Sequence, residues 1–400
     1  MENIPDGSIL CSAGFRAGAA ACGIKKTEGT LDVALIVCDG PAAGAGVFTK
    51  NSFAAAPVRW NRERLPSEDI RAIAVNSGNA NACTGERGER DVQRIADLVA
   101  GLVDCRAEQV CVASTGIIGH PLPMGKLEAG VRDAHACLGA AEADARLAER
   151  AIMTTDTRPK AAAVRSAVDG IPFHVGGTAK GAGMISPNMA TMLAFVTTDA
   201  RVSPADLRVF LSEATDRTLN RITVDGDSST NDSVILLASG RSGAQVSAGG
   251  PGAGKFREAL HAVMESLALQ IVRDGEGATK LIEVRVEGAA DAESAHRVAR
   301  TVAESQLFKC AAYGNDPNWG RIVCAIGYSG VPVRPESTTV HIGPVCVFRE
   351  GMPTGEDATE PMHADSICVR IDLGTGPGQA TLHTCDLTEE YVRINAEYPT

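Results

Sequence analysis

Short runs of β-branched and other apolar residues recur in both halves of this 400-residue chain and constrain its fold more than any other feature. Their length and composition are typical of β-strands. The runs lie at residues 31–38, 70–75, 281–286, 321–326 and 366–373. We therefore expect sheet structure in the N-terminal and the C-terminal half alike.

Two segments between these runs have the apolar spacing of helices that pack on a sheet. The first contains Val92, Ile95, Val99, Leu102 and Val103, and the second contains Phe256, Leu260, Val263, Met264 and Leu267. Strands and helices do not alternate regularly. The order therefore favours a layered α/β or α+β fold, with sheets sandwiched between helices, over a doubly wound parallel sheet. The 42 glycines and the aromatic content of 4% suit closely packed layers joined by tight turns.

The charge and the cysteine pattern exclude several classes of protein. The net charge is -11 and no basic stripe is present, so nucleic acid is not an expected partner. The twelve cysteines form no C-x-x-C pair, and we interpret them as reduced, small hydrophobic residues, for example Cys38 and Cys324 within apolar runs. The histidine spacing does not indicate a zinc site, so no metal is expected.

The N-terminal segment and the Gly-rich segment 242–255 bear on location and on phosphate binding. Acidic Glu2 and Asp6 stand where a leader would be basic, and no apolar run could cross a bilayer. We expect a cytoplasmic protein without a membrane partner. Gly249 to Lys255 nearly match a phosphate loop, but Phe256 replaces the Ser or Thr that binds magnesium. A surface loop before a helix is the preferred interpretation.

Residues 180–195, KGAGMISPNMATMLAF, are the most informative segment. A glycine-rich, polar stretch passes at Thr191 into an apolar, strand-like one. Taken alone, Thr191 is most simply the first residue of a strand, because threonine favours strands.

The surrounding motif changes this interpretation, because it resembles the hallmark of the ornithine acetyltransferases, the bifunctional glutamate N-acetyltransferases of arginine biosynthesis. Further blocks that are similar to this family keep its order along nearly the whole chain. They are GVFTKN (46–51), VNSGNANACTG (75–85), ASTGIIG (113–119), IMTTDTRPK (152–160), NRITVDGDSSTNDS (220–233), VRDGEGATK (272–280), YGNDPNWGRI (313–322) and CDLTEEYVRINAEYPT (385–400). The resemblance also implies a fold like that of N-terminal-nucleophile aminopeptidases.

The resemblance implies that Thr191 cuts the Ala190–Thr191 bond, which leaves an alpha fragment (1–190) and a beta fragment (191–400). The free α-amine would then deprotonate the threonine hydroxyl, since its reference pKa is near ~8. Thr115 and Gly116 would stabilise the oxyanion. From the residues alone, a simple turn that ends the strand-like run 109–113 is the favoured interpretation.

By the same resemblance, substrate contacts fall on six residues along the chain. These are Thr154, Lys180, Thr191, Glu276, Asn395 and Thr400. Lys180 suits a carboxylate, and Glu276, in a Gly-flanked turn, suits an ammonium group. On the sequence alone, each charged group could be an ordinary solvated residue. Because Thr400 ends the chain, the C-terminus would have to be held in place, so an extension there should reduce activity.

The implied reaction is a ping-pong transfer of acetyl from N-acetylornithine to glutamate, without a metal or redox cofactor. Acetyl-CoA is a possible second donor, and the resemblance implies an α2β2 assembly of the two fragments. Two other functions remain open at this point. One is an N-terminal-nucleophile amidohydrolase or aminopeptidase, and the other is a non-enzymatic amino-acid sensor.

Overall fold

The computed structural model describes residues 1–186 and 192–397, and Thr191, Ala190 and Thr400 lie outside the described residues. The chain forms two compact units. Among the described residues, the first comprises Met1–Asn220 and Asp227–Ile271, and the second comprises Arg221–Gly226 and residues 272–397. These units are defined by their internal packing, whereas the predicted fragments 1–190 and 191–400 are defined by a cut in the backbone.

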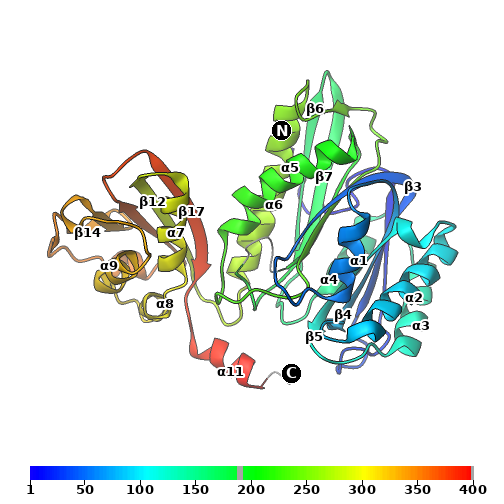
Figure 1. Ribbon diagram of the computed structural model, residues 1–400, viewed down its shortest axis with the longest axis horizontal. Coiled ribbons are helices and arrows are strands. Elements are labelled where there is room, and N and C mark those ends of the chain that lie inside the picture. The colour runs from blue at the N-terminus through cyan, green and yellow to red at the C-terminus, as the bar shows by residue number, and fades with distance from the viewer. Residues whose placement is uncertain (187–191, 398–400) are drawn as a thin grey trace. The chain divides into compact units, whose positions relative to one another are not determined.

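The first unit is built on a nine-stranded mixed sheet (Figure 1). Its order is β1-β6-β7-β8-β10-β3-β4-β5, and β2 also pairs with β3. The strands are β1 (Glu2–Asn3), β2 (Phe15–Ala20), β3 (Val33–Phe48), β4 (Ser67–Asn79), β5 (Val110–Ile117), β6 (Lys160–Val168), β7 (Ile171–Lys180), β8 (Leu193–Thr198) and β10 (Ser233–Ala238). The runs at 31–38 and 70–75 are confirmed as strands, and the mixed strand order confirms the layered fold.

Helices cover both faces of this sheet. The helices of this unit are α1 (Ala56–Arg64), α2 (Gly85–Val103), α3 (Met124–Ala136), α4 (Glu142–Ile152), α5 (Pro204–Arg217) and α6 (Ala253–Arg273). Helices α1, α2 and α3 pack on one face, where Leu35 and Val37 join their apolar cluster. Helix α4 packs on the other face, where Ile36 and Phe195 lie in a second cluster. Alternate residues of β3 thus serve opposite layers, as the period of a strand requires.

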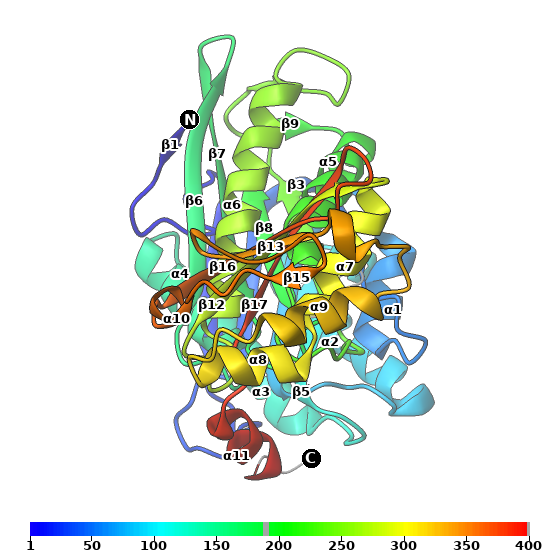
Figure 2. The same cartoon turned by 90° about the vertical axis from the view of Figure 1, so that its left-hand side faces the viewer.

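Helix α6 lies along β6 and β7 in both views (Figures 1 and 2). It packs closely on β7 because Gly177 has no side chain, and a Cβ there would lie 3.0 Å from Leu267. Phe256, near the start of the helix, lies between Phe173 and Phe210 with ring centroids 5.9 and 5.0 Å away, and its ring is tilted relative to both. All five apolar residues predicted for this helix are fully buried, so the prediction is confirmed.

The second unit holds a six-stranded sheet of order β15-β14-β13-β16-β12-β17. Its strands are β12 (Leu281–Ala289), β13 (Thr339–Ile342), β14 (Val345–Arg349), β15 (Met352–Pro353), β16 (Ser366–Asp372) and β17 (Gly378–Cys385). Its helices are α7 (Ala292–Ala303), α8 (Gln306–Tyr313), α9 (Trp319–Gly327), α10 (Thr359–Met362) and α11 (Glu389–Glu397). Helix α7 shares an apolar cluster with β12 and β17. The runs at 281–286 and 366–373 are confirmed as strands.

The strand predicted at 321–326 is wrong, because this segment belongs to helix α9. Asn318 caps the helix by accepting a hydrogen bond from the Arg321 backbone amide at 3.2 Å. Ile322, Ala325 and Ile326 form its buried face at helical spacing. Cys324 is consequently exposed, which corrects the prediction that its thiol is packed like an aliphatic side chain.

The cysteines and the Gly-rich segment fit the remaining expectations in part. All twelve cysteines are free, and Cys38 is buried as predicted, but Cys83, Cys137 and Cys310 are exposed like Cys324. Residues 242–252 form a loop that contains the short strand β11 (Gln245–Val246), which pairs with β9 (Arg201–Val202), and residues 253–255 of the predicted loop already belong to the first turn of α6.

Within the described residues, neither a membrane-spanning helix nor a cluster of metal ligands is present. In the described part of the chain, no helix has the length and apolarity needed to span a bilayer. Among residues 1–186 and 192–397, no group of three or more His, Cys, Asp or Glu side chains is placed to bind a metal ion.

Candidate active site

The predicted oxyanion residues lie where β5 ends beside β4. These strands run parallel, Thr115 pairs with Ser77 and Gly116 pairs with Gly78, and the register then shifts. Gly116 has a φ of 131°, and a Cβ at this position would lie 2.3 Å from the backbone carbon of Gly78. Only glycine fits here, so backbone groups of the two strand ends are brought unusually close.

Asn231 ties this strand end to the start of β10. Its side-chain amide donates to the carbonyl oxygens of Ser114, at 2.8 Å, and Ala80, at 2.5 Å. Its own carbonyl accepts from the Thr230 hydroxyl at 2.7 Å. Ser114 immediately precedes Thr115, so the buried Asn231 fixes the oxyanion residues relative to β10.

Strand β10 in turn fixes the start of β8. The two strands are parallel, Ser233 pairs with Leu193, and the Ser233 amide donates to the Met192 carbonyl at 3.0 Å. Met192 directly follows Thr191 in the sequence. The structure thus brings Thr115 and Gly116 to the same end of the sheet as the beginning of β8.

Lys180 and Thr154 lie at this end of the sheet as well. Lys180 is the last residue of β7, is 8% exposed, and pairs with Leu193 at the start of β8. The half-buried Thr154 belongs to the loop between α4 and β6. A single carboxylate connects them, because Asp156 accepts from the Thr154 amide at 2.9 Å and from the Gly181 amide at 2.6 Å.

Asp156 is ionised although it is buried. Burial would raise the pKa of its carboxyl, but the Lys180 and Lys160 ammonium groups and the hydrogen bonds from Lys160 and Gly181 outweigh burial and hold it at about 2. Lys160 is fully buried, and its Nζ lies 2.6 Å from Asp156 Oδ1.

Two other titratable groups lie near Lys180. Burial lowers the pKa of Lys25 to about 8, although Asp32 and Asp156 act in the opposite direction and Lys180 adds to the lowering. Burial also raises the pKa of Asp232 well above its usual value, despite the opposing effects of Ser229, the Lys180 ammonium and Thr49. The Lys25 ammonium therefore loses its proton at a lower pH than that of an exposed lysine, and the Asp232 carboxyl keeps its proton to a higher pH than that of an exposed aspartate.

Glu276 and Asn395 lie together in the second unit. The Asn395 amide, on α11, donates to Glu276 Oε2 at 2.7 Å. Glu276 stands in the predicted glycine-flanked turn, where Gly277 has a φ of 68°. The Gly277 carbonyl accepts from the Thr388 hydroxyl at 2.8 Å, which holds this turn against the segment that leads into α11.

The sequence predictions missed Asn231, Asp156, Lys160 and Lys25. The first three stand within the quoted blocks 220–233 and 152–160, yet only Thr154 was selected from these blocks. Thr154 and Lys160 are close to Asp156 in the sequence, so their hydrogen bonds are local. The burial of Asp156 and Lys160, and the distant partners of Asp156 and Asn231, appear only in the folded structure.

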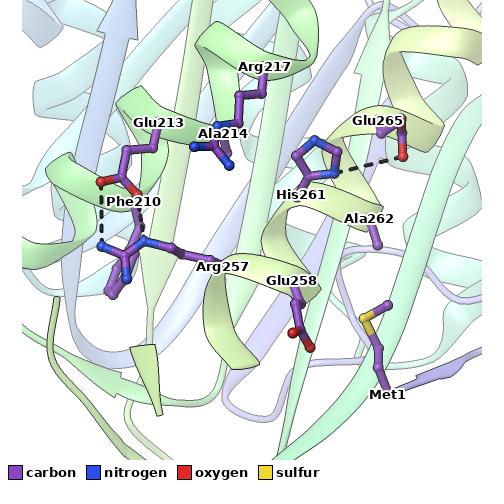
Figure 3. A pocket seen from close by; sticks show the side chains of 10 residues that line it. All are labelled: Met1, Phe210, Glu213, Ala214, Arg217, Arg257, Glu258, His261, Ala262 and Glu265. Carbon is purple, nitrogen blue, oxygen red and sulfur yellow. Dashed lines mark hydrogen bonds and ion pairs between the residues drawn. The ribbon is translucent and has the colours of Figure 1, made fainter. Parts of the chain in front are cut away.

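A separate hollow of about 450 Å³ lies between α5 and α6 in the first unit (Figure 3). It contains none of the predicted site residues. Arg257 pairs there with Glu213 at 2.6 Å, and His261 lies 3.7 Å from Glu265. These side chains are substantially exposed, so they do not form a buried polar site.

The comparisons with known proteins agree on one family. The model of the ArgJ family matches residues 16–400. The arginine biosynthesis bifunctional protein ArgJ of Symbiobacterium thermophilum is 48% identical over 399 residues, which cover 98% of this chain and 99% of that protein. The protein of the same name from Dehalococcoides mccartyi is 45% identical over 405 residues, covering 100% of this chain and 99% of that one.

A solved structure agrees with these relatives. The crystal structure of arginine biosynthesis bifunctional protein argJ from Bacillus halodurans is 48% identical, covers 52% of this chain and 100% of that chain, and has a TM-score of 0.50. The chain therefore belongs to the ArgJ family, and the resemblance to the acetyltransferases of arginine biosynthesis that its motifs indicate is confirmed.

Proposed function

We propose that this protein transfers an acetyl group from N2-acetyl-L-ornithine to L-glutamate through an acetyl ester on Thr191, after it has cut itself between Ala190 and Thr191. The observation that carries the proposal is the convergence at one end of the first sheet. There, Asn231 joins the residue before Thr115 to β10, β10 pairs with β8 directly after Thr191, and Lys180 pairs with the same end of β8.

Cleavage would begin when the Thr191 hydroxyl attacks the Ala190 carbonyl carbon, which breaks the C–N bond, frees the α-amine of Thr191 and leaves Ala190 bound to the threonine oxygen as an ester. Water then hydrolyses the ester, which releases the Ala190 carboxylate and restores the Thr191 hydroxyl. The extent of the Bacillus halodurans crystal chain supports this step. That chain is fully covered by 52% of the present chain, and residues 191–400 make up 210 of the 400 residues.

In the first half-reaction, the neutral α-amine takes the proton of the Thr191 hydroxyl as its oxygen attacks the acetyl carbonyl of N-acetylornithine. Donors at Thr115 and Gly116 stabilise the oxyanion, and ornithine leaves with a proton on its nitrogen. In the second half-reaction, the glutamate amine attacks the acetyl ester, which gives N-acetylglutamate and restores the hydroxyl.

The charges that we assign to substrate binding follow from the chemistry of the substrates. Both substrates carry an α-carboxylate, for which the Lys180 ammonium is suited. Thr154 is linked to the end of β7 at Lys180, because the amides of Thr154 and Gly181 both donate to Asp156. Glu276 and Asn395, which are hydrogen-bonded to each other, are assigned to the ornithine ammonium and to polar substrate groups. Thr400 completes the proposed set.

Two finer properties belong to the same proposal. The word bifunctional in the names of both relatives supports acetyl-CoA as a second acetyl donor for glutamate. We also propose that the alpha and beta fragments stay associated as an α2β2 assembly. An assay with acetyl-CoA in place of N-acetylornithine tests the first property, and the mass of the native assembly in solution tests the second.

Product analysis tests the reaction itself. The purified protein is incubated with N-acetylornithine in the presence and absence of glutamate, and both amino acids and their acetyl forms are quantified. N-acetylglutamate that forms in step with ornithine supports the transferase. Free acetate at the same rate with and without glutamate would instead identify an amidohydrolase. Ligand binding without turnover would identify a sensor.

A further inference from the structure

The connection between Thr154 and Lys180 passes through the buried ion pair of Asp156 and Lys160. Asp156 Oδ1 accepts from Lys160 Nζ and from the Gly181 amide, each at 2.6 Å. Asp156 Oδ2 accepts from the Thr154 amide at 2.9 Å. One carboxylate therefore meets three donors that come from a loop, from β6 and from the residue after β7.

The environment of this pair makes its geometry rigid. The side chains of Asp156 and Lys160 are both 0% exposed, so water does not compete for either charge. Lys160 opens β6 and pairs with Ala179 on β7, while its backbone carbonyl accepts from the Thr178 hydroxyl at 2.9 Å. The backbone of Lys160, whose side chain supplies the ammonium group, is thus fixed by the pairing of β6 with β7.

A buried ion pair is seldom maintained for stability alone, because the loss of hydration offsets most of the attraction between the charges. Here the pair connects two segments that each carry a proposed substrate contact. A shift of about 1 Å in such a contact can lower the rate by about 100-fold.

We propose that Asp156 is a positioning residue for substrate binding. It fixes Thr154 and the end of β7 at Lys180 in one arrangement, and Lys160 holds its carboxylate in place. This inference rests on the proposed function, since it concerns the same substrate-binding site. It assigns to Asp156 and Lys160 no contact with the substrate.

The principal test is Asp156→Asn in the full-length protein. The amide has nearly the shape of the carboxylate, but it lacks the charge and directs an N–H group toward one of the present donors. We expect KM for N-acetylornithine and for glutamate to rise about 10- to 100-fold, with a smaller change in kcat. A KM within twofold of the wild-type value in a folded and cleaved variant would overturn the proposal.

The matched control is Asp91→Asn, the same substitution at another buried aspartate of the first unit. Asp91 is 4% exposed and lies on α2, where its carboxylate is 3.8 Å from Arg87. This variant should keep the wild-type KM for both substrates. Circular dichroism and a denaturing gel establish that both variants are folded and cut. If Asp156→Asn does not fold, the next variant decides the question.

Lys160→Met tests the same arrangement through its pH dependence. The charged groups near Asp156 are Lys160, Lys180 and Lys25. Removal of one ammonium group and its hydrogen bond raises the pKa of Asp156, because burial remains. We expect kcat/KM to fall between pH 8 and pH 5 more steeply in this variant than in the wild type. Superimposable profiles would contradict the proposal.

Failure of the proposed function gives a different result. If the wild-type protein does not transfer acetyl between the two substrates, the function itself is wrong and neither variant is informative. If the wild-type protein transfers acetyl and both variants keep its KM and its pH profile, only the role of Asp156 is wrong.

Discussion

Single residues at the end of the first sheet are constrained by geometry that other side chains do not satisfy. Gly116 combines a φ of 131° with a virtual Cβ that lies 2.3 Å from Gly78. Asp232 is 2% exposed, and within the described part of the chain its Oδ2 has no hydrogen-bond partner. Natural sequences tolerate a strained backbone or an unpaired buried oxygen mainly where function requires it.

Gly116→Ala should strongly reduce activity. The methyl group collides with the β4 backbone and displaces the oxyanion donors, and the loss of one such donor lowers kcat by about 100- to 1000-fold. Steady-state kinetics of acetyl transfer provide the measurement. Gly101→Ala on α2 is the control, because its Cβ meets no atom within 4 Å. That variant should gain up to about 1 kcal/mol in stability with unchanged kcat.

Asp232→Asn should change how stability depends on pH. Because the pKa of Asp232 is raised in the folded protein, folding takes up a proton above the unfolded pKa, and the stability from this group falls as pH rises. The neutral amide lacks this dependence. We expect thermal unfolding to show a Tm difference, variant minus wild type, that is larger at pH 8 than at pH 4. An equal difference at both pH values would show that folding does not raise the pKa of this carboxyl.

At the scale of elements, the predicted site depends on how the starts and ends of strands are joined. Asn231 links β10 to β5, and the pairing of β10 with β8 extends that link to the residue after Thr191. Asn61 makes a similar pair of hydrogen bonds to Val112, farther back on β5, at 2.7 and 3.0 Å. A comparison of variants at Asn231 and Asn61 therefore distinguishes the effect of the link between β10 and β5 from the general effect of losing a buried amide.

Asn231→Ala and Asn61→Ala should each destabilise the protein by about 1 to 3 kcal/mol, because buried backbone groups lose their hydrogen-bond partners. Only Asn231→Ala should also lower kcat by more than tenfold with little change in KM, since it releases the oxyanion residues and not the carboxylate contacts. Chemical denaturation and steady-state kinetics measure the two effects. Equal kcat values in the two variants would refute the positioning role of Asn231.

Local sequence patterns predicted most of the proposed strands and helices, but they failed where a short apolar run fits both a strand and a helix. The run at 31–38 forms a strand whose apolar residues are buried on both faces of a covered sheet. The run at 281–286 forms a strand in which alternate residues point toward a core. The run at 321–326 has Ile322, Ala325 and Ile326 at helical spacing, and the capping residue Asn318 lies outside that window. Asp156 could not be selected, because the burial of its carboxylate and the donor Gly181 come from tertiary structure, although Thr154 and Lys160 are close to it in the sequence.

At the scale of the whole molecule, the account depends on the two ends that the proposed cut and the C-terminus provide. Thr191 would become a new N-terminus, and Thr400, the last residue, is assigned to substrate binding. Both lie outside the described residues, so both assignments remain predictions. Asn395, a proposed substrate contact close to Thr400 in the sequence, lies on α11 and is hydrogen-bonded to Glu276.

A C-terminal extension should therefore reduce activity. Extra residues after Thr400 remove its carboxylate and displace the hydroxyl from its proposed position, so we expect KM for ornithine-type substrates to rise at least tenfold. The same tag at the N-terminus is the control, because Met1 is 59% exposed. Equal kinetics of the two tagged proteins would exclude Thr400 from the site.

The central claim is that one threonine becomes a chain terminus and then carries the acetyl group. Intact mass spectrometry of the purified protein, together with N-terminal sequencing, tests this claim most directly. The account predicts two fragments that end at Ala190 and begin at Thr191, an uncut Thr191→Ala variant, and a gain of one acetyl group on the Thr191 fragment after addition of N-acetylornithine without glutamate. An uncut wild-type chain that transfers acetyl at full rate would contradict it.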